Sequence, residues 1–402
     1  MRLEYDGSDA PLEAIQTVNV VKRPLHLHYW DSCPGLDYAS AVMFSGSGQL
    51  MDEESFIDYW TNRGVLVLPW TGGICCTNSK TVDDMAQDWV GAYRTGFDGV
   101  TIDEFGSQAG QFLGDVIIRA RELEPQSYFA VDAIAVGDAM AEDLRQAVDL
   151  VMVEVYPVSA VDGYARIEDR VQGAIDRGLG DKTVAALGID GFGITTDLEL
   201  RRQLHFTRYT FPNMNGIAFF GTMRELVPAH NKLLPQFYIG PVLRVTARPQ
   251  GSGSRVEVLN IGTADASTTQ VQVQREGDPS NKISIQVPPL AVGQTHVAYI
   301  TQPNVVPVTE YREDTPILGP PLLWEEEPAE LRPNAATPCL TPGPVISTVS
   351  ESFSTMPPLQ LETDTSGSVV AASYAFHPRK GIPRSWNSTC DWIAMGSMAA
   401  SR

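Results

Sequence analysis

The sequence has few cysteines, no long apolar run and no recognisable leader. The cysteines are Cys33, Cys75, Cys76, Cys339 and Cys390. No two of them have a CxxC spacing, so neither a disulfide framework nor a zinc site is predicted. No stretch approaches the roughly 20 consecutive apolar residues that a membrane-spanning helix needs. Residues 1–15 lack a basic region followed by an apolar one, so we expect a soluble protein, either cytoplasmic or secreted with a leader outside this sequence.

Positive charge is also scarce. Lys and Arg number 29 against 49 Asp and Glu, a formal net charge of −20. Such a chain repels phosphate backbones and anionic lipid headgroups, so nucleic acid and membrane surfaces are poor partners, and neutral or cationic ligands remain. No GxGxxG, Walker or GxSxG pattern occurs, which argues against a dinucleotide, a bound phosphate or a serine nucleophile. We expect no cofactor.

What the sequence has is length and alternating apolar segments. At 402 residues with 43% hydrophobic and 19% charged side chains, the chain is long enough for more than one domain. We predict a (β/α)-barrel domain over residues 1–236, a β-sandwich over 237–302, and an irregular tail rich in Pro, Ser and Thr over 303–402.

The barrel prediction rests on short β-branched runs that alternate with longer amphipathic ones, a pattern typical of βα units around a parallel sheet. Regular alternation over about 200 residues favours a closed (β/α)8 TIM barrel over an open sheet. Seven strands are predicted: 24–30, 65–70, 99–104, 128–133, 150–156, 183–189 and 216–220. The eighth strand is either 12–21 or 42–44. Helices are predicted at 51–62, 81–95, 107–123, 138–147, 163–177 and 197–210.

Beyond residue 228 the period of the pattern changes to two. Alternating apolar and polar residues punctuated by Gly, Asn, Pro and Asp predict antiparallel strands. These strands cover 242–247, 255–260, 268–275, 282–287 and 294–301. The tail shows no sustained period, so we expect it to be extended or disordered.

Glu154 is the most informative candidate for chemistry. It interrupts the apolar run LVMVEVYP at 150–157, where an unpaired carboxylate would be costly. Burial raises the pKa of a carboxyl group toward the range that a general acid near neutral pH needs. The structural alternative is that Glu154 caps a loop or pairs with an arginine such as Arg166.

Asp103 and Glu104 end another predicted strand. Adjacent strand residues point to opposite faces, so only one of them faces the barrel mouth unless the strand has already bent into its loop. Active sites of such barrels lie at the carboxyl ends of the strands. A carboxylate from this strand could therefore lie near Glu154, at the roughly 5–9.5 Å separation that paired acids use to cleave glycosidic bonds. A solvated pair in a loop is the alternative.

Aromatic and polar residues recur at the same strand ends. The candidates for substrate binding are Trp30, Trp70, Phe105, Tyr156, His28 and Asp190. Ring faces suit the C–H faces of sugars. Core packing is the alternative for the rings, and turn formation among glycines explains Asp190 equally well.

His26 and His28 form an HxH pair on the first predicted strand, a spacing that places both rings on one side of the strand. A metal-dependent hydrolase of this type needs further histidines at later strand ends. None of the other histidines in the chain lies at one. We therefore predict no metal site and keep the metal-dependent hydrolase as a lesser alternative.

The segment GFDGVTIDEFG at 96–106 resembles the DG-x-x-x-D stretch that many glycoside-hydrolase barrels carry on a central strand, and LVMVEVYP resembles their acidic strand end. A barrel followed by a β-sandwich is a frequent layout in that group. The resemblance implies that Asp103 or Glu104 is one catalytic carboxylate and Glu154 its partner, acting on an oligo- or polysaccharide. The rival hypothesis is a non-catalytic barrel that binds carbohydrate. No oligomeric state is predicted.

Overall fold

The computed structural model describes residues 2–5, 12–15, 25–30, 35–44, 52–72, 80–106, 111–156, 160–189, 194, 196–221, 226–321, 360–363 and 369–373. The chain divides into two compact units, Met1–Met356 and Pro357–Arg402. The first unit contains the predicted barrel and sandwich. In the second, β18 (Gln360–Thr363) pairs antiparallel with β19 (Val369–Ser373).

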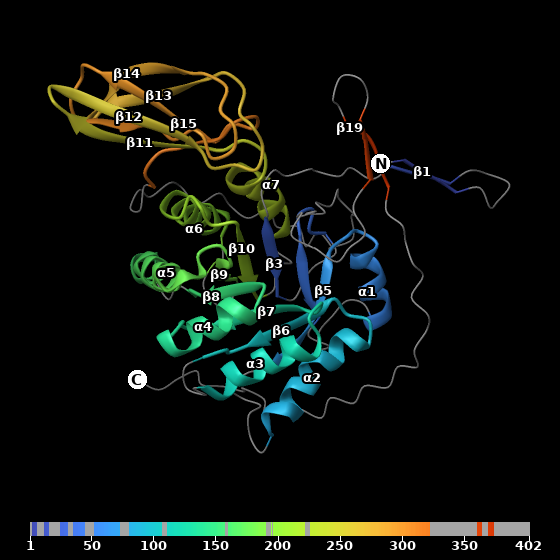
Figure 1. Ribbon diagram of the computed structural model, residues 1–402. Coiled ribbons are helices and arrows are strands. Elements are labelled where there is room, and N and C mark those ends of the chain that lie inside the picture. Colours follow the sequence, from blue (N-terminus) through green and yellow to red (C-terminus); the bar gives the residue numbers. More distant parts are fainter. Residues whose placement is uncertain are drawn as a thin grey trace. The chain divides into compact units, whose positions relative to one another are not determined.

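The barrel prediction is confirmed, because eight parallel strands close in the order β10-β3-β4-β5-β6-β7-β8-β9 (Figure 1). The strands are β3 (His26–Tyr29), β4 (Ala41–Phe44), β5 (Leu66–Gly72), β6 (Gly99–Asp103), β7 (Tyr128–Ala133), β8 (Leu150–Glu154), β9 (Thr183–Gly188) and β10 (Gly216–Phe220). The eighth strand is therefore β4, the second of the two segments considered. Within residues 12–21, β2 (Leu12–Ile15) pairs instead with β1 (Arg2–Tyr5).

The helices lie on the outside of the strands (Figure 1). They are α1 (Glu53–Thr61), α2 (Val82–Arg94), α3 (Gln111–Leu123), α4 (Asp138–Ala147), α5 (Ala160–Ala174), α6 (Asp197–Thr210) and α7 (Val227–Tyr238). Six match predicted helices, and α5 continues into a π-helical turn, η3 (Ile175–Leu179). Capping boxes at Thr81 and Thr196 begin α2 and α6 by satisfying main-chain N–H groups. None of the described helices is long and apolar enough to cross a bilayer.

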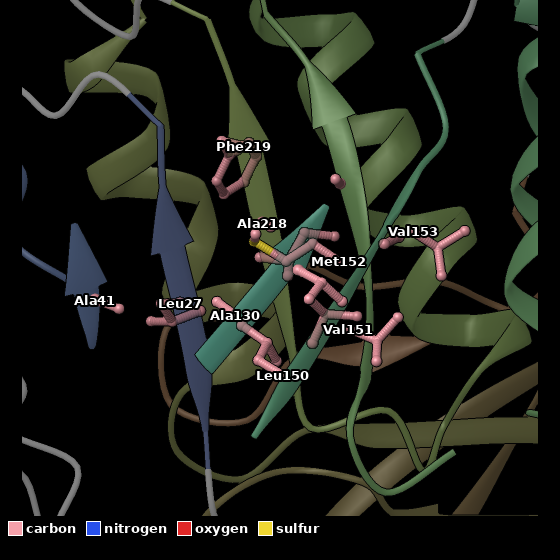
Figure 2. Close-up of a cluster of buried hydrophobic side chains, with 14 of the residues drawn as sticks. Leu27, Ala41, Ala130, Leu150, Val151, Met152, Val153, Ala218 and Phe219 are labelled. Carbon is pink, nitrogen blue, oxygen red and sulfur yellow. The ribbon is translucent and has the colours of Figure 1, made fainter. Parts of the chain in front are cut away.

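The register of the strands decides which side chains fill the barrel. His28 on β3 contacts Thr101 on β6, with Nε2 and Oγ1 3.5 Å apart. These strands are not neighbours in the sheet, so both side chains point into the barrel. Side chains alternate along each strand, and paired residues on neighbouring strands point to the same face, so the inward-pointing residues of the other strands follow from these two. Figure 2 shows the alternation on β8, where Met152 points toward Ala218 and Val151 and Val153 point away from it.

The sandwich consists of a four-stranded sheet, β15-β12-β11-β17, and a three-stranded sheet, β14-β13-β16. Its strands are β11 (Leu243–Gln250), β12 (Gly253–Asn260), β13 (Thr269–Arg275), β14 (Asp278–Val287), β15 (Thr295–Ile300), β16 (Val305–Pro307) and β17 (Ile317–Leu318). The sheets thus continue past residue 302, where we placed the sandwich's end. Val305 and Ile317 are buried in its hydrophobic core, and burying them offsets the entropy of ordering two short strands.

Two side chains of α6 form hydrogen bonds both within the barrel domain and to segments that follow it. The buried Arg208 donates to the main-chain oxygens of Phe237, Met214 and Ile261. His205 Nε2 donates to the carbonyl of Gly319 at 2.8 Å, so its Nδ1 accepts the hydroxyl of Tyr311, also at 2.8 Å. The hydrogen bonds to Ile261, Tyr311 and Gly319 join α6 to residues of the sandwich region.

Candidate active site

Three consecutive barrel strands carry a carboxyl group near their carboxyl ends. Asp103 ends β6, Asp132 is the fifth residue of β7, and Glu154 ends β8. Asp103 follows the inward-pointing Thr101 by two positions. Thr101 pairs with Ala130, two residues before Asp132, and Asp132 pairs with Met152, two residues before Glu154. All three side chains therefore share the inner face of the barrel at its carboxyl end.

Asp103 is partly buried and bound by two N–H groups. Trp70 Nε1 donates to its Oδ2 at 3.0 Å, and the main-chain N–H of Glu104 donates to its Oδ1 at 2.9 Å. Burial raises the pKa of Asp103 to about 6, which the Trp70 hydrogen bond opposes and the charge of Glu104 reinforces. This carboxyl group changes its charge in the range where acid–base catalysts operate.

Glu104 stands where β6 turns into its loop. Its φ of 47° lies in the left-handed region that residues other than glycine rarely adopt. The strand ends at Asp103, so alternation no longer sends Glu104 to the opposite face. Its charge raises the pKa values of Asp103, Asp132 and Glu154. The bend therefore keeps both carboxyl groups of the doublet near the barrel mouth.

Asp132 is a residue that the sequence argument missed. It is 3% exposed, and the Tyr156 hydroxyl donates to its Oδ2 at 3.2 Å. Burial, followed by the charges of Asp103 and Glu154, raises its pKa well above the ordinary value. The criterion used for Glu154 would also have identified Asp132 from the sequence, since Asp132 interrupts an apolar strand, YFAVDA.

Glu154 is half-buried, and burial raises its pKa while the charge of Arg170 opposes the shift. Arg170 Nη1 donates to the main-chain oxygen of Glu154, and Arg166 Nη1 donates to that of Tyr156 at 2.7 Å. Both guanidinium groups thus hold the backbone at the end of β8. Within the described ranges neither arginine forms an ion pair with the Glu154 carboxylate. The alternative in which Glu154 pairs with Arg166 is therefore not what the structure shows.

Three rings form a row beside these carboxyl groups. Tyr156 stacks on Phe220 with ring centres 5.0 Å apart and planes inclined by 23°, and Phe220 contacts Trp30 at 4.6 Å. Phe105, in contrast, is fully buried in the barrel's hydrophobic core, so packing accounts for it. The row joins Trp30 and Tyr156, two predicted binding residues, through Phe220.

His28 lies deeper in the barrel, 1% exposed. Burial, aided by His26, lowers its pKa to about 3, so the ring is neutral near pH 7. Its neighbour His26 is near Tyr128, with Nδ1 and the hydroxyl 3.4 Å apart. Among the residues that the structure describes, no group of three or more His, Cys, Asp or Glu side chains is arranged to hold a metal ion. Asp190 lies outside the described residues.

No protein-family model and no curated protein sequence matches the chain. Among solved structures, it is similar to active domain 2 of a thermostable chitinase from Pyrococcus furiosus, with 16% identity over 51% of this chain and 86% of that one and a TM-score of 0.38. The likeness is one of fold. The glycoside hydrolase domain of PgaB from Bordetella bronchiseptica matches with 11% identity, 52% and 99% coverage and a TM-score of 0.36. The homocysteine methyltransferase MmuM of Escherichia coli matches with 10% identity, 52% and 96% coverage and a TM-score of 0.34.

Fold does not determine chemistry, so the functional argument rests on the residues at the barrel mouth. Carboxyl groups whose environments raise their pKa values to different extents can hold a proton in one place and a negative charge in another. Adjacent aromatic rings offer apolar faces with polar edges. This arrangement can bind a polyhydroxylated ring and transfer protons to and from it.

Proposed function

We propose that this protein is a glycoside hydrolase that acts on a neutral or cationic oligo- or polysaccharide through paired carboxyl groups. The observation that carries the proposal is the presence of Asp103 and Glu154 on the same inner face, at the carboxyl ends of β6 and β8. The row of Trp30, Phe220 and Tyr156 supports the choice of a sugar, because stacked rings complement sugar C–H faces.

In the proposed reaction Glu154 is the general acid and base. Its proton passes to the glycosidic oxygen as the bond from that oxygen to the anomeric carbon breaks. The Asp103 carboxylate stabilises or attacks the positive anomeric carbon. Water then supplies hydroxide to that carbon, which breaks any bond formed to Asp103 and leaves its carboxylate free, and the remaining proton returns to Glu154. Burial raises the pKa of Glu154 in the direction that a general acid needs, and Asp103, whose pKa burial raises to about 6, gains its negative charge as pH rises through that value.

Release of reducing ends from neutral polysaccharides and chitosan, with the full chain and with Glu154→Gln, tests the proposal. Gln keeps the shape of Glu but cannot carry the transferred proton, so turnover should fall by roughly 10²- to 10⁴-fold. Glu168→Gln is the matched control, because Glu168 is exposed on α5. Unchanged turnover in Glu154→Gln would refute the assignment.

The rival function is sugar binding without turnover. Its support is the same aromatic row, which needs no acid to hold a ring. Calorimetric binding of an oligosaccharide, with no product from any substrate between pH 4 and 9, would favour this function over hydrolysis.

A further inference from the structure

Asp132 is the most deeply buried carboxyl group of the site, and the proposed reaction does not use it. It lies on β7, between the strands that carry Asp103 and Glu154. In the part of the chain that the structure describes, its Oδ1 has no hydrogen-bond partner, and no ion pair involves the side chain. A buried charge in that position would be uncompensated and costly.

The groups that face Asp132 add to this cost. They are Asp103 on β6, Glu104 in the loop after it, Glu154 on β8 and the hydroxyl of Tyr156. Three of the four are acidic and repel a negative charge at Asp132, and only the Tyr156 hydroxyl favours one. A carboxyl group surrounded in this way keeps its proton while its neighbours ionise.

The hydrogen bond from Tyr156 connects Asp132 to the aromatic row. Tyr156 donates to Oδ2 at 3.2 Å and stacks on Phe220 at 5.0 Å. Its main-chain oxygen is also held by Arg166. The ring is thus fixed at its hydroxyl, at one face and at its backbone. Removing the acceptor would remove this hydrogen bond from the hydroxyl of the ring.

We propose that Asp132 is a positioning residue: as a neutral buried carboxyl it accepts the Tyr156 hydroxyl and fixes that ring against Phe220 as a platform for a sugar. The platform's use rests on the proposed function, whereas the neutral state and the hydrogen bond do not. Asn should therefore replace Asp132 with little loss of sugar affinity, because its amide oxygen accepts the same hydrogen bond and carries no charge.

The first test needs no substrate. The full chain is labelled with ¹³C at tyrosine Cζ, and the Tyr156 signal is assigned by its loss in Tyr156→Phe. We expect the chemical shift of that signal to follow the same pH profile from pH 5 to 8 in the wild type and in Asp132→Asn. Asp132 stays neutral in this range, and any change in shift caused by ionisation of Asp103 or Glu154 occurs in both proteins. A step present in the wild type and absent in Asp132→Asn would show that Asp132 ionises, and would overturn the proposal.

The second test measures binding of cellohexaose, chitohexaose and xylohexaose by calorimetry, in the Asp103→Asn background to prevent turnover. Adding Asp132→Asn should change the dissociation constant of a bound hexaose by less than about threefold, whereas Asp132→Leu and Tyr156→Phe should each weaken it by roughly tenfold. The variant that combines Asp132→Leu with Tyr156→Phe should bind no more weakly than either single variant, because the two changes remove the same hydrogen bond.

Additive losses, or a tenfold loss in Asp132→Asn, would overturn the positioning role. If Asp132→Leu does not fold, Asp132→Asn and Tyr156→Phe still decide the question. Failure of all three hexaoses to bind would refute the sugar platform. Binding with the expected pattern but no hydrolysis by the wild type would reject the glycosidase and leave the positioning role standing.

Discussion

The carboxyl groups at the two ends of the barrel differ in whether a cation pairs with them. At the amino end, Asp149 precedes β8 and is bound by Arg121 Nη2 at 2.6 Å and by the main-chain N–H of Phe129 at 2.8 Å. Arg121 also donates to the carbonyls of Ala147, Pro125 and Ser127. At the carboxyl end, Asp103, Asp132 and Glu154 share the inner face, and no described cation forms an ion pair with any of them.

The difference separates charges that stabilise the fold from charges that cost stability. A charge with a close partner and filled hydrogen bonds lowers the free energy of the folded state, whereas crowded carboxyl groups raise it. Crowding persists in enzymes where perturbed pKa values serve a reaction. The amino end therefore belongs to the scaffold, and the carboxyl end to the proposed site.

The largest expected effect is on turnover at the carboxyl end. Asp103→Asn should lower kcat by about 10³-fold, because the amide cannot supply the negative charge needed at the anomeric carbon. Glu104→Gln should lower it less than tenfold, since Glu104 lies beyond the inward-facing strand residue. Steady-state kinetics on a hydrolysed substrate, with circular dichroism to verify folding, measure both. The reverse order would assign the catalytic role to Glu104.

At the amino end the expected effect is on stability. Arg121→Met should lower the free energy of unfolding by about 2 kcal/mol, because it leaves Asp149 without its cation and three carbonyls without the guanidinium donor. Arg119→Met is the control: Arg119 and Asp83 are 41% and 71% exposed, and exposed pairs contribute about 0–1 kcal/mol. Urea denaturation compares the two variants. Equal losses would show that the pair of Arg121 and Asp149 stabilises the fold no more than an exposed pair does.

A smaller effect concerns the pH dependence of stability at the carboxyl end. The pKa of Asp103 is about 6 in the folded state and about 3.9 in an unfolded chain. Between these values the folded state binds more protons, so its stability falls as pH rises from about 4 to 6. Asp103→Asn does not ionise, so its gain in unfolding free energy over the wild type should be about 1–2 kcal/mol larger at pH 8 than at pH 4. Denaturation at both pH values checks this, and a gain larger at pH 4 would contradict it.

Most of the barrel could be predicted because each element carries its own pattern. Seven strands read as apolar runs, but β4 has only four residues, AVMF, which the sequence alone did not distinguish from another short run. Helix α7 was missed because Pro228 and Pro235 interrupt its pattern. In the structure Pro228 lies in the first turn, where a missing N–H is tolerated.

The candidate site could be predicted only as strand ends. The sequence identified Asp103 and Glu154 as carboxylates that follow apolar runs, but it could not tell that they share a face, because that depends on pairing between strands. The left-handed backbone at Glu104 had no signal. The link from Asp132 to Tyr156 joins β7 to residues after β8, so it arises only when the sheet forms.

The smallest expected effect concerns the Trp70 indole. Its N–H donates to Asp103 Oδ2 at 3.0 Å and holds the pKa of Asp103 below the value that burial alone would set. Trp70→Phe removes the donor and keeps an aromatic ring, so the pKa should rise by about 0.5–1 unit, as expected for one lost hydrogen bond of about 1 kcal/mol. The acidic limb of the pH–kcat/KM profile should then move upward by the same amount. An unmoved limb together with a raised KM would indicate that Trp70 contacts substrate rather than tuning Asp103, and would place the indole with the aromatic row.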